Sequence, residues 1–467
     1  MSLAQVLADA HPDIEVLAPS PATGPYLHDT GTRRAAVDGA VGPTVAYPRT
    51  VEQVQDLVRT AAALGVPVVP RGAGTGLSGG AVADADHLVV STDRLDRVLE
   101  VSPLDEVAVV EPGVVNADLN VHLEPYGLFY APDPASHDIS TIGGNVATNA
   151  GGLRCAKYGV TRESVLALDV VLADGSLISV GRRTLKGVTG LDLASLFVGS
   201  EGILGIVVRA TLRLRPVPVA RRTLTAFFGS TAAGAQALAA ITRSPVRPAV
   251  VEFLDEPTLR DIDETNGTGL RERGASLVLV ELDGYGIDEQ DRDLTAALTA
   301  VGGTVRAEPP AEAEHLWHLR RHGRGFGQGT PRWTIGEDIA VPRSVLPDVY
   351  AYFAELEQRY DVRVSAVAHA GDGNLHPVLS RDLGPGDDPA VLPDDLTEAA
   401  TALVRFALAH GGTVSGEHGI GSVKLDWAAL ELDERNLVVQ RAVKDALDPH
   451  HLLNPGKAIP HALVATA

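Results

Sequence analysis

Apolar and polar residues follow a helical period near the start of the chain. In residues 50–64 apolar side chains recur every three or four positions, as on one face of an α-helix. Thr50 is a suitable N-cap, Gln53 can complete a capping box, and Gly65 can end the helix. The short apolar run 66–69 then predicts a strand that leads into a glycine-rich loop.

The pattern changes after Pro216-Val-Pro218, which we expect to be a domain boundary. Beyond it, apolar runs of four to seven residues alternate with amphipathic segments, which predicts an α+β sheet with helices packed on it. We expect strands at Leu224–Phe228, Val250–Leu254, Leu277–Leu282, Ile335–Val341 and Val362–Ala368. We expect helices at Ala232–Thr242, Glu289–Val301, Glu312–Arg320, Val345–Tyr360, Leu396–His410 and Glu434–Ala446.

The first glycine-rich loop contains Gly74-Thr-Gly-Leu-Ser-Gly79, which satisfies the dinucleotide template G-x-G-x-x-G, and Asp93 lies about 20 residues downstream. The next expected strand, 88–91, begins eight residues after Gly80. A parallel crossover usually needs a helix of ten residues or more, so we exclude a nicotinamide-binding Rossmann fold. Two interpretations remain, a backbone cradle for a pyrophosphate and a structural turn.

Two further loops share this composition. Residues 140–154 combine Gly and Ala with Ser, Thr and Asn, so the backbone can lie against a large planar ligand while small polar groups form hydrogen bonds to it. Residues 199–207 form a third loop that leads into a strand. Three such loops indicate an extended cofactor that is contacted at several points.

Histidines and acids gather in the second half of the chain. His369 and His376 follow an expected strand, and Glu417 and His418 form a pair flanked by glycines. Two imidazoles and a carboxylate can hold a divalent metal, while His418 could act as a base. The alternative is that these are hydrogen-bonding loop residues, and Asp372 suits a turn. On its own this cluster also fits a metallohydrolase, which would be colourless.

Composition removes several classes of protein. The chain has 39 basic and 60 acidic residues, a net charge of −21, which argues against nucleic-acid binding. One cysteine, Cys155, excludes a disulfide framework, a Cys-based zinc finger and an iron–sulfur cluster carried by this chain. The sequence shows neither a secretory signal nor an apolar run of transmembrane length. We therefore expect a cytoplasmic protein, and a peripheral association with a membrane stays open.

The glycine motifs PRGAGTGLSGG, PDPASHDISTIGGNVATNAGGLRCAKYG and GSEGILGIV resemble the p-cresol-methylhydroxylase-type FAD domain of the vanillyl-alcohol-oxidase superfamily. The motifs AHAGDGNLHP, SGEHGIG and NPGK resemble the FAD-linked D-2-hydroxyacid dehydrogenases, which include D-lactate dehydrogenase, the glycolate oxidase flavin subunit and D-2-hydroxyglutarate dehydrogenase. The resemblance covers about residues 35–460. It implies a two-lobed FAD domain (35–217) after an N-terminal extension (1–34), an α+β substrate or cap domain with an antiparallel sheet (218–445), and a C-terminal segment returning to the flavin domain (446–467).

The resemblance also assigns cofactor contacts to the glycine motifs. No histidine lies between Arg71 and Gly80, so the FAD is expected to be non-covalent, although His137 in the second loop keeps a covalent link open. The residues expected to hold the pyrophosphate are Arg71, Gly72, Ala73, Gly74, Thr75, Gly76, Ser78 and Gly79; those around the flavin and ribityl chain are Pro134, Ser136, Thr141, Gly144, Asn145, Thr148 and Gly151; those near the adenine end are Glu201, Gly202 and Ile206; and Asn454 of NPGK is a further cofactor contact.

The same resemblance implies a metal site and a catalytic pair. His369, His376 and Glu417 match the ligands of a divalent metal, Zn or Mn/Fe, and His418 matches a catalytic imidazole. Arg320 matches the residue that contacts the substrate carboxylate, although an exposed helix-end cation is the simpler alternative.

The expected reaction is oxidation of a D-2-hydroxy acid to the 2-oxo acid. D-2-Hydroxyglutarate enzymes of this family carry Asn and Lys at the positions of Val378 and, approximately, Gly336, so their absence favours D-lactate, although Arg321 and Arg324 could substitute. D-2-Hydroxyglutarate dehydrogenase and a glycolate oxidase flavin subunit that acts only inside a complex remain alternatives. Electrons must pass to an external acceptor such as a quinone, an electron-transfer flavoprotein, a cytochrome, a partner subunit or oxygen. The oligomeric state stays open, with a homodimer as one option.

Overall fold

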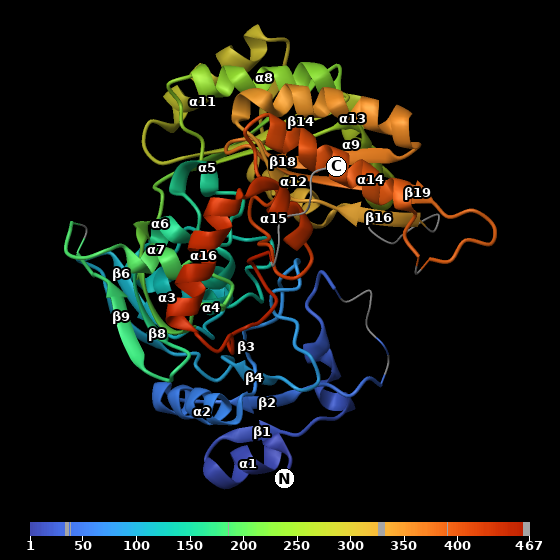
Figure 1. Ribbon diagram of the computed structural model, residues 1–467. Helices are drawn as coiled ribbons and strands as arrows, with labels where there is room; N and C mark the ends of the chain where they lie inside the picture. Colours follow the sequence, from blue (N-terminus) through green and yellow to red (C-terminus); the bar gives the residue numbers. More distant parts are fainter. Residues whose placement is uncertain (33–36, 38, 185, 326–331, 390, 461–467) are drawn as a thin grey trace. The chain divides into compact units, whose positions relative to one another are not determined.

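The computed structural model describes residues 1–467 except 33–36, 38, 185, 326–331, 390 and 461–467. The last seven positions of the expected C-terminal segment therefore lie outside the described residues. The chain divides into two compact units. Unit 1 comprises residues 1–151, 159–217 and 417–467, and unit 2 comprises residues 152–158 and 218–416. Figure 1 shows both units and labels many of their elements.

Unit 1 begins with a small sheet whose short apolar strands are buried. Its order is β1-β2-β4-β3; β1 (Glu15–Leu17) is antiparallel to β2 (Thr44–Tyr47), whereas β2, β4 (Leu88–Ser91) and β3 (Val68–Arg71) are parallel. Helix α2 (Val51–Leu64) buries its apolar face in the same core, to which α1 (Leu3–Ala10) also contributes, and Figure 1 shows α2 beside the sheet.

The predicted ends of α2 are confirmed, with one difference. Thr50 accepts a hydrogen bond from the backbone N–H of Gln53, and Gly65 ends the helix in a left-handed conformation with φ 64°. The reciprocal half of the capping box is wrong, because the Gln53 side chain accepts from the backbone N–H of Arg49 at 2.6 Å instead of from Thr50.

A second sheet of unit 1 is antiparallel. Among the described residues it has five strands in the order β5-β6-β10-β8-β9, and α3 and α4 pack against it through Leu119, Leu123, Ile142 and Val146. The elements are β5 (Val98–Ser102), β6 (Val107–Val110), β8 (Val165–Val171), β9 (Leu177–Gly181), β10 (Ile206–Arg213), α3 (Asn116–Leu123), α4 (Ile142–Thr148), α6 (Thr161–Ser164) and α7 (Leu193–Phe197). Short pieces lie at η1 (Pro21–Leu27), η3 (Glu124–Tyr126), β7 (Leu128–Phe129) and β11 (Arg215–Pro216).

The C-terminal segment packs into unit 1. After α15 (Leu425–Glu431) and α16 (Glu434–Leu447), the chain runs beside β3, where Val68 N–H donates to Leu452 O at 2.7 Å and Asn454 N–H donates to Val68 O at 2.8 Å. Lys444, buried at the end of α16, donates to the Asp448 carboxylate and to the backbone carbonyls of Ile203 and Leu453. The two backbone bonds attach residues 452–454 to strand β3, which lies far earlier in the sequence, and Lys444 ties the end of α16 to Ile203 and Leu453.

Unit 2 is built on one antiparallel sheet. Its described strands number eight, seven of them in the order β15-β12-β14-β13-β18-β19-β16, with β17 also paired to β19. Helices α8, α11 and α13 lie along one face, as Figure 1 shows, with α14 beside α13, whereas α9 and α12 share an apolar cluster with the strands on the other face. The strands are β12 (Arg221–Phe228), β13 (Val250–Leu254), β14 (Ser276–Asp283), β15 (Thr304–Ala307), β16 (Arg332–Gly336), β17 (Ile339–Ala340), β18 (Arg363–His369) and β19 (Asn374–Asp382). The helices are α5 (Cys155–Tyr158), α8 (Thr231–Arg243), α9 (Glu256–Asn266), α10 (Leu270–Arg273), α11 (Ile287–Ala300), α12 (Pro310–His322), η4 (Arg343–Val345), α13 (Leu346–Tyr360) and α14 (Asp394–Ala409).

The predicted strand Ile335–Val341 is wrong as a single element. It splits into β16 and β17 because Glu337 and Asp338 interrupt it, and the buried carboxylate of Asp338 is used by Asn374 and Ser415. Helix α9 was not predicted. The signal was present, because Asp255 caps it by accepting from Thr258 N–H at 2.9 Å.

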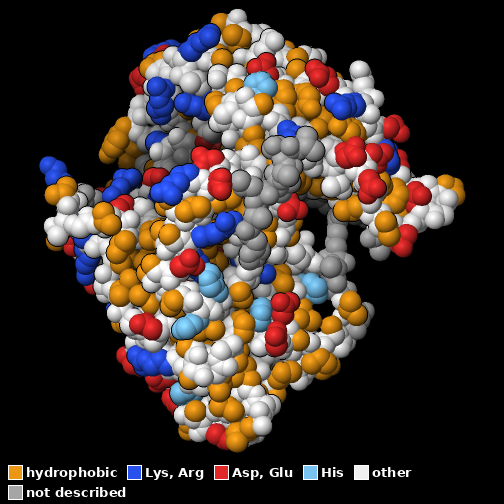
Figure 2. All heavy atoms as spheres, viewed as in Figure 1, with side chains coloured by type: hydrophobic (Ala, Val, Ile, Leu, Met, Phe, Trp, Pro, Cys, Tyr) orange, Lys and Arg blue, Asp and Glu red, His pale blue; other side chains and the backbone are white. Residues whose placement is uncertain are grey.

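Charges of both signs appear on the face shown in Figure 2, where acidic side chains lie among the basic ones. None of the described helices combines the length and the low polarity that a membrane crossing requires.

We expect Phe253→Ala to lower the free energy of unfolding by about 3–5 kcal/mol, because it empties a packed site. The ring is fully buried on β13, and it meets Tyr350 of α13 edge-on with centroids 4.9 Å apart. Urea unfolding measures the loss. Leu104→Ala, at a residue that is 98% exposed, is the control and should change nothing measurable. Equal losses in the two variants would contradict this packing.

Candidate functional site

The first glycine-rich loop, residues 72–87, joins two parallel neighbours, β3 and β4, without a helix. The premise that a parallel connection at this point requires a helix was therefore wrong: the irregular loop spans the distance. Arg71 at its start is buried, donates to Ala81 O at 2.7 Å and stacks over Tyr26. A Cβ on Gly74, whose φ is +68°, would lie 2.2 Å from the Arg71 guanidinium. Glycine at position 74 thus lets the backbone fold over Arg71.

The second loop touches the first. Thr141 caps α4 by accepting from Gly144 N–H at 3.4 Å, and Thr148 donates to Gly144 O at 3.2 Å. A Cβ on Gly72 would lie only 2.3 Å from Thr141 Oγ1, so the two loops are in contact at this point. The structure thus brings Gly72 together with Thr141 and helix α4, as expected for two parts of one cofactor site.

The third loop joins the same cluster. Gly199 N–H donates to Val146 O at 2.9 Å, and Glu201 N–H donates to Ala147 O at 2.8 Å. The side-chain amide of Asn454 donates to Gly80 O at 2.8 Å and to Glu201 O at 2.7 Å, which ties the first loop to the third. The three loops and Asn454, far apart in the sequence, therefore form one assembly in unit 1.

Two buried polar groups of the second loop fit a ligand. Ser140 Oγ and Asn145 Nδ2 belong to residues that are 2% and 3% exposed, and neither atom has a hydrogen-bond partner among the described residues. A buried donor without a partner is costly, so such groups usually meet a ligand or water. Ile206 contributes differently, because its side chain is buried in the apolar core of unit 1 and leaves only backbone atoms for a cofactor.

Ser78 and Glu201 hold the segment 417–423 within unit 1. Ser78 Oγ donates to Gly419 O at 2.9 Å, and the Glu201 carboxylate accepts from the backbone N–H groups of Ile420 (2.8 Å) and Gly421 (2.7 Å). Burial raises the pKa of Glu201, and the two backbone N–H groups offset this only in part. Both side chains, which the resemblance assigned to FAD, thus also fix the segment that carries Glu417 and His418.

In unit 2, one buried carboxylate joins His369 to Arg320. Glu252 of β13 is fully buried; its Oε1 lies 2.6 Å from His369 Nδ1, and its Oε2 accepts from Arg320 Nε at 2.5 Å. Burial would raise the pKa of Glu252, but the charge of Arg320 and the hydrogen bonds with His369 and Arg320 outweigh it and hold that pKa below its ordinary value. Arg320 is therefore no surface cation: its side chain is 10% exposed and ion-paired.

His376 lies close to His369 and to the carboxylate of Asp338. Its ring is perpendicular to that of His369, with centroids 5.0 Å apart, and its Nδ1 is 3.8 Å from the Asp338 carboxylate. Asp338 accepts from Asn374 Nδ2 at 2.7 Å and from Ser415 Oγ at 2.8 Å. Structure thus brings the two predicted histidine ligands together on the neighbouring strands β18 and β19.

Glu417 and His418 follow directly after Gly416, the last residue of unit 2. Within unit 2, Gly416 lies against Asn374 and Asp338, and a Cβ there would be 2.1 Å from Asn374 Nδ2. Within unit 1, a Cβ on Gly151 would be 2.4 Å from Glu417 Oε2, so Glu417 lies against the second glycine loop. Two successive residues thus have different neighbours: Gly416 lies against Asn374 and Asp338, and Glu417 lies against Gly151.

Sequence reasoning missed Glu252 and Asp338. Glu252 was visible as a lone acid in the apolar strand VVEFL, a position where a carboxylate persists only with a partner. Asp338 was hidden, because its partners Asn374 and Ser415 are 36 and 77 residues away.

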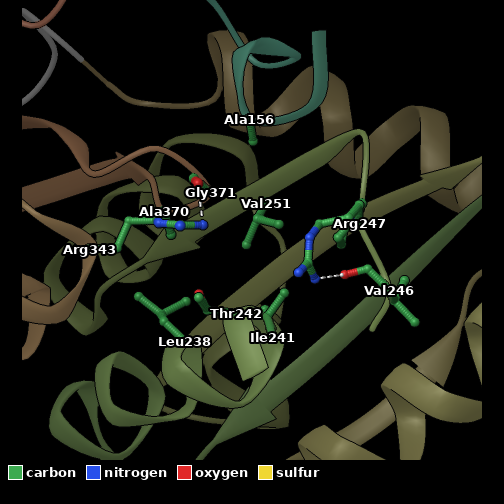
Figure 3. Close-up of a pocket in the computed structure, with 11 residues that line it drawn as sticks. Ala156, Leu238, Ile241, Thr242, Val246, Arg247, Val251, Arg343, Ala370 and Gly371 are labelled. Carbon is green, nitrogen blue, oxygen red and sulfur yellow. Dashed lines mark hydrogen bonds between the residues drawn. The ribbon is translucent and has the colours of Figure 1, made fainter. Parts of the chain in front are cut away.

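A separate hollow in unit 2 lies beside the loop that follows His369. Its empty space is about 480 Å³, including the part open to solvent. Figure 3 shows Arg247 and Arg343 at this hollow, with Arg343 hydrogen-bonded to the Gly371 carbonyl and apolar side chains of α8 nearby. None of the predicted site residues lines it.

Two family descriptions match this chain. Residues 43–181 match "FAD binding domain", and residues 217–458 match "FAD linked oxidases, C-terminal domain". The chain belongs to the FAD-linked oxidase family. It is thus an FAD-linked oxidoreductase, FAD is its cofactor, and neither the nicotinamide fold nor the metallohydrolase alternative stands.

Relatives of this FAD-linked oxidase match along most of its length. "Glycolate oxidase subunit GlcD" from Bacillus subtilis is 38% identical, over 88% of this chain and 88% of that protein. "D-2-hydroxyglutarate dehydrogenase" from Xanthomonas citri pv. viticola is 36% identical over the same shares. "D-lactate dehydrogenase" from Anaerostipes hadrus is 32% identical, over 92% of each chain.

Solved structures confirm the predicted fold of the FAD-linked oxidase. The substrate-bound structure of p-cresol methylhydroxylase gives a TM-score of 0.74, with 17% identity, over 95% of this chain and 94% of that one. Alkyldihydroxyacetonephosphate synthase gives 0.77, with 18% identity, over 97% and 85%. At these identities the likeness concerns the fold alone.

We expect Glu201→Gln to loosen the segment 417–424 while the rest of unit 1 keeps its structure. A glutamine retains one carboxamide oxygen, so one of the N–H groups of Ile420 and Gly421 loses its acceptor, at a cost of about 1–3 kcal/mol. Amide hydrogen exchange of peptide 417–424, followed by mass spectrometry, should become faster by about tenfold or more. Glu111→Gln is the matched control, because Glu111 is also a buried glutamate of unit 1 but pairs with Arg97. Unchanged exchange in Glu201→Gln would contradict the role of Glu201.

Proposed function

We propose that this FAD-linked oxidase oxidises a D-2-hydroxy acid to the 2-oxo acid, with D-lactate as the favoured substrate. The observation that carries the proposal is the chain of contacts Arg320–Glu252–His369, which brings a guanidinium that could bind a carboxylate and an imidazole that could ligate a metal into one buried cluster. The printed names of three relatives, which concern glycolate, D-2-hydroxyglutarate and D-lactate, support the same class of substrate.

Arg320 holds the substrate carboxylate in this proposal. Glu252 engages Nε and Nη2, which form one edge of the guanidinium. The end-on edge, formed by Nη1 and the second hydrogen of Nη2, is the one that can bind a carboxylate in a bidentate manner. A buried acid behind the guanidinium also keeps the planar group in one orientation.

The residues present fit a divalent metal. His369 and His376 supply imidazoles on adjacent strands, and Glu417 would supply the carboxylate that completes a set of two nitrogens and one oxygen. The donor set suits Zn or Mn/Fe. Such an ion would act as a Lewis acid that lowers the pKa of the substrate hydroxyl.

His418 is the proposed base. A neutral imidazole accepts the hydroxyl proton near pH 7, while Arg320 keeps the carboxylate fixed. Bound FAD supplies the acceptor for the hydride that leaves the substrate Cα. The N–H groups of Ile420 and Gly421, held by Glu201, limit the freedom of the loop that carries His418.

The local side chains favour a small monocarboxylate. Gly336 and Val378 are direct register partners on β16 and β19, and Val378 is two residues beyond His376 on the same strand face. Neither residue has a side chain that can bind a second carboxylate. A substrate with one carboxylate, such as D-lactate, therefore suits this chain better than D-2-hydroxyglutarate.

The second candidate is a flavin subunit that works only inside a complex. It is favoured by the relative from Bacillus subtilis, whose name describes a subunit, at 38% identity. In either case an external acceptor, such as a quinone, an electron-transfer flavoprotein, a cytochrome or a partner subunit, must collect the electrons.

Anaerobic bleaching of the flavin absorbance tests the substrate class. We expect D-lactate to bleach the visible band at lower concentration than glycolate or D-2-hydroxyglutarate, and L-lactate to leave it unchanged. Bleaching by L-lactate alone would contradict the assigned stereochemistry. A yellow protein that none of these acids bleaches would instead favour the subunit that needs a complex.

Replacement of His418 by asparagine tests the base. We expect turnover to fall by about 10² or more, because proton removal loses its acceptor, while the FAD content stays that of the wild type. Steady-state kinetics with an artificial dye and the flavin absorbance measure the two quantities. His122→Asn, at an exposed histidine of α3, is the control and should keep full activity. Turnover within a few-fold of the wild type in His418→Asn would remove His418 from this role.

A further inference from the structure

Glu252 lies at a position where burying a charged side chain costs free energy. Residues two apart on a strand share a face, so Glu252 faces the same way as Val250 and Leu254 of β13. Those two neighbours belong to the apolar cluster that α9 and α12 cover, and Glu252 itself is completely buried. A carboxylate removed from water in this way persists only when strong donors meet both oxygens.

Both oxygens of Glu252 are met by residues with a proposed role. Glu252 and His369 are direct register partners on β13 and β18, which brings Oε1 to 2.6 Å from His369 Nδ1. Oε2 accepts from Arg320, which reaches the strand from the last turn of α12. One rigid strand residue thus fixes groups from two other elements.

The contact with Nδ1 determines how His369 can act. A neutral imidazole carries one N–H, and a carboxylate at 2.6 Å places that hydrogen on Nδ1. The lone pair that can bind a metal is then on Nε2, and the carboxylate makes that nitrogen a better donor. A Glu–His pair of this kind would orient the ring before any metal arrives.

We propose that Glu252 is a positioning residue that sets both the metal affinity of His369 and the carboxylate affinity of Arg320. This inference rests on the proposed function, which gives His369 and Arg320 their roles. Since one buried group serves both, weakening it affects metal binding and substrate binding together.

The alternative is a purely structural role, in which the buried ion pair of Glu252 only stabilises the sheet. The chain offers a matched control in Glu308, a buried glutamate that follows β15 in the same unit. Its side chain is fully buried, and it accepts from Arg273 Nη2 and Thr225 Oγ1, both at 2.6 Å. None of these partners belongs to the proposed site.

The experiment compares Glu252→Gln, Glu252→Asp and Glu308→Gln with the wild type, all loaded with FAD. The dissociation constant for Zn²⁺ or Mn²⁺ is measured by chelator competition on metal-depleted protein, and KM and kcat for D-lactate are measured after reloading. FAD absorbance and the melting temperature show that each variant is folded. Glu252→Asp keeps the carboxylate on a side chain that is one methylene shorter. It therefore tests the positioning role of Glu252 if the glutamine variant does not fold.

We expect Glu252→Gln to weaken metal binding by about 10–100-fold and to raise KM by about tenfold, because an amide accepts through only one oxygen. Glu252→Asp should lie between this variant and the wild type, and Glu308→Gln should keep both constants even where its melting temperature falls. If the metal dissociation constant and KM of Glu252→Gln equal those of Glu308→Gln, the role of Glu252 is overturned, while the proposed function is unaffected. A wild type that binds no metal and keeps its turnover after chelation would overturn the metal part of the proposed function, and the inference with it.

Discussion

A carboxylate taken out of water must be met by donors, and this constraint organises both units of the protein. Glu201 collects two backbone N–H groups, Asp338 collects an amide and a hydroxyl, and Glu252 collects an imidazole and a guanidinium. Each acid is buried, and each fixes a segment that carries a proposed functional group. The donors lie far away from each acid in the sequence. The hydrogen bonds to the acid therefore form only when the segments that carry the proposed functional groups come together.

Close backbone approach is the second organising feature. Gly72 meets Thr141, Gly80 meets Glu201, and Gly151 meets Glu417 at separations that a Cβ would fill. The small residues thus let the loops pack against one another, and they leave buried polar groups such as Asn145 Nδ2 without a partner in the described part of the protein, where a ligand could meet them. A single turn would need far fewer glycines.

The sequence predicted the elements whose signal is local. The helix at α2 carries its period, its cap Thr50 and its end Gly65 within 16 residues. The fold class followed from the motifs and is confirmed by solved structures. The histidine pair was also predictable, because His369 and His376 lie on one hairpin. The cofactor, metal and catalytic roles given to single residues stay predictions.

Long-range pairing explains what the sequence did not reveal. Nothing near Glu252 indicates that its partners are 68 and 117 residues away. The break between β16 and β17 falls at Glu337 and Asp338, and the partner that Asp338 finds in Ser415 is 77 residues away, so the sequence alone predicts a single strand over 335–341. The parallel pairing of β3 and β4 without a helix depends on Arg71 bracing the loop from inside, which no spacing rule anticipates.

Asn454 has a consequence for biogenesis. Its amide closes the contact between Gly80 and Glu201, across 374 and 253 residues of chain. On the ribosome those loops are made early, yet Asn454, which joins them, emerges only after all of unit 2 has been synthesised. Unit 2 is synthesised in between and can fold first, as an inserted body of its own. The contact between these two loops is therefore completed only after unit 2 has been made, and a chain that stops before Asn454 would leave the carbonyls of Gly80 and Glu201 without this amide donor.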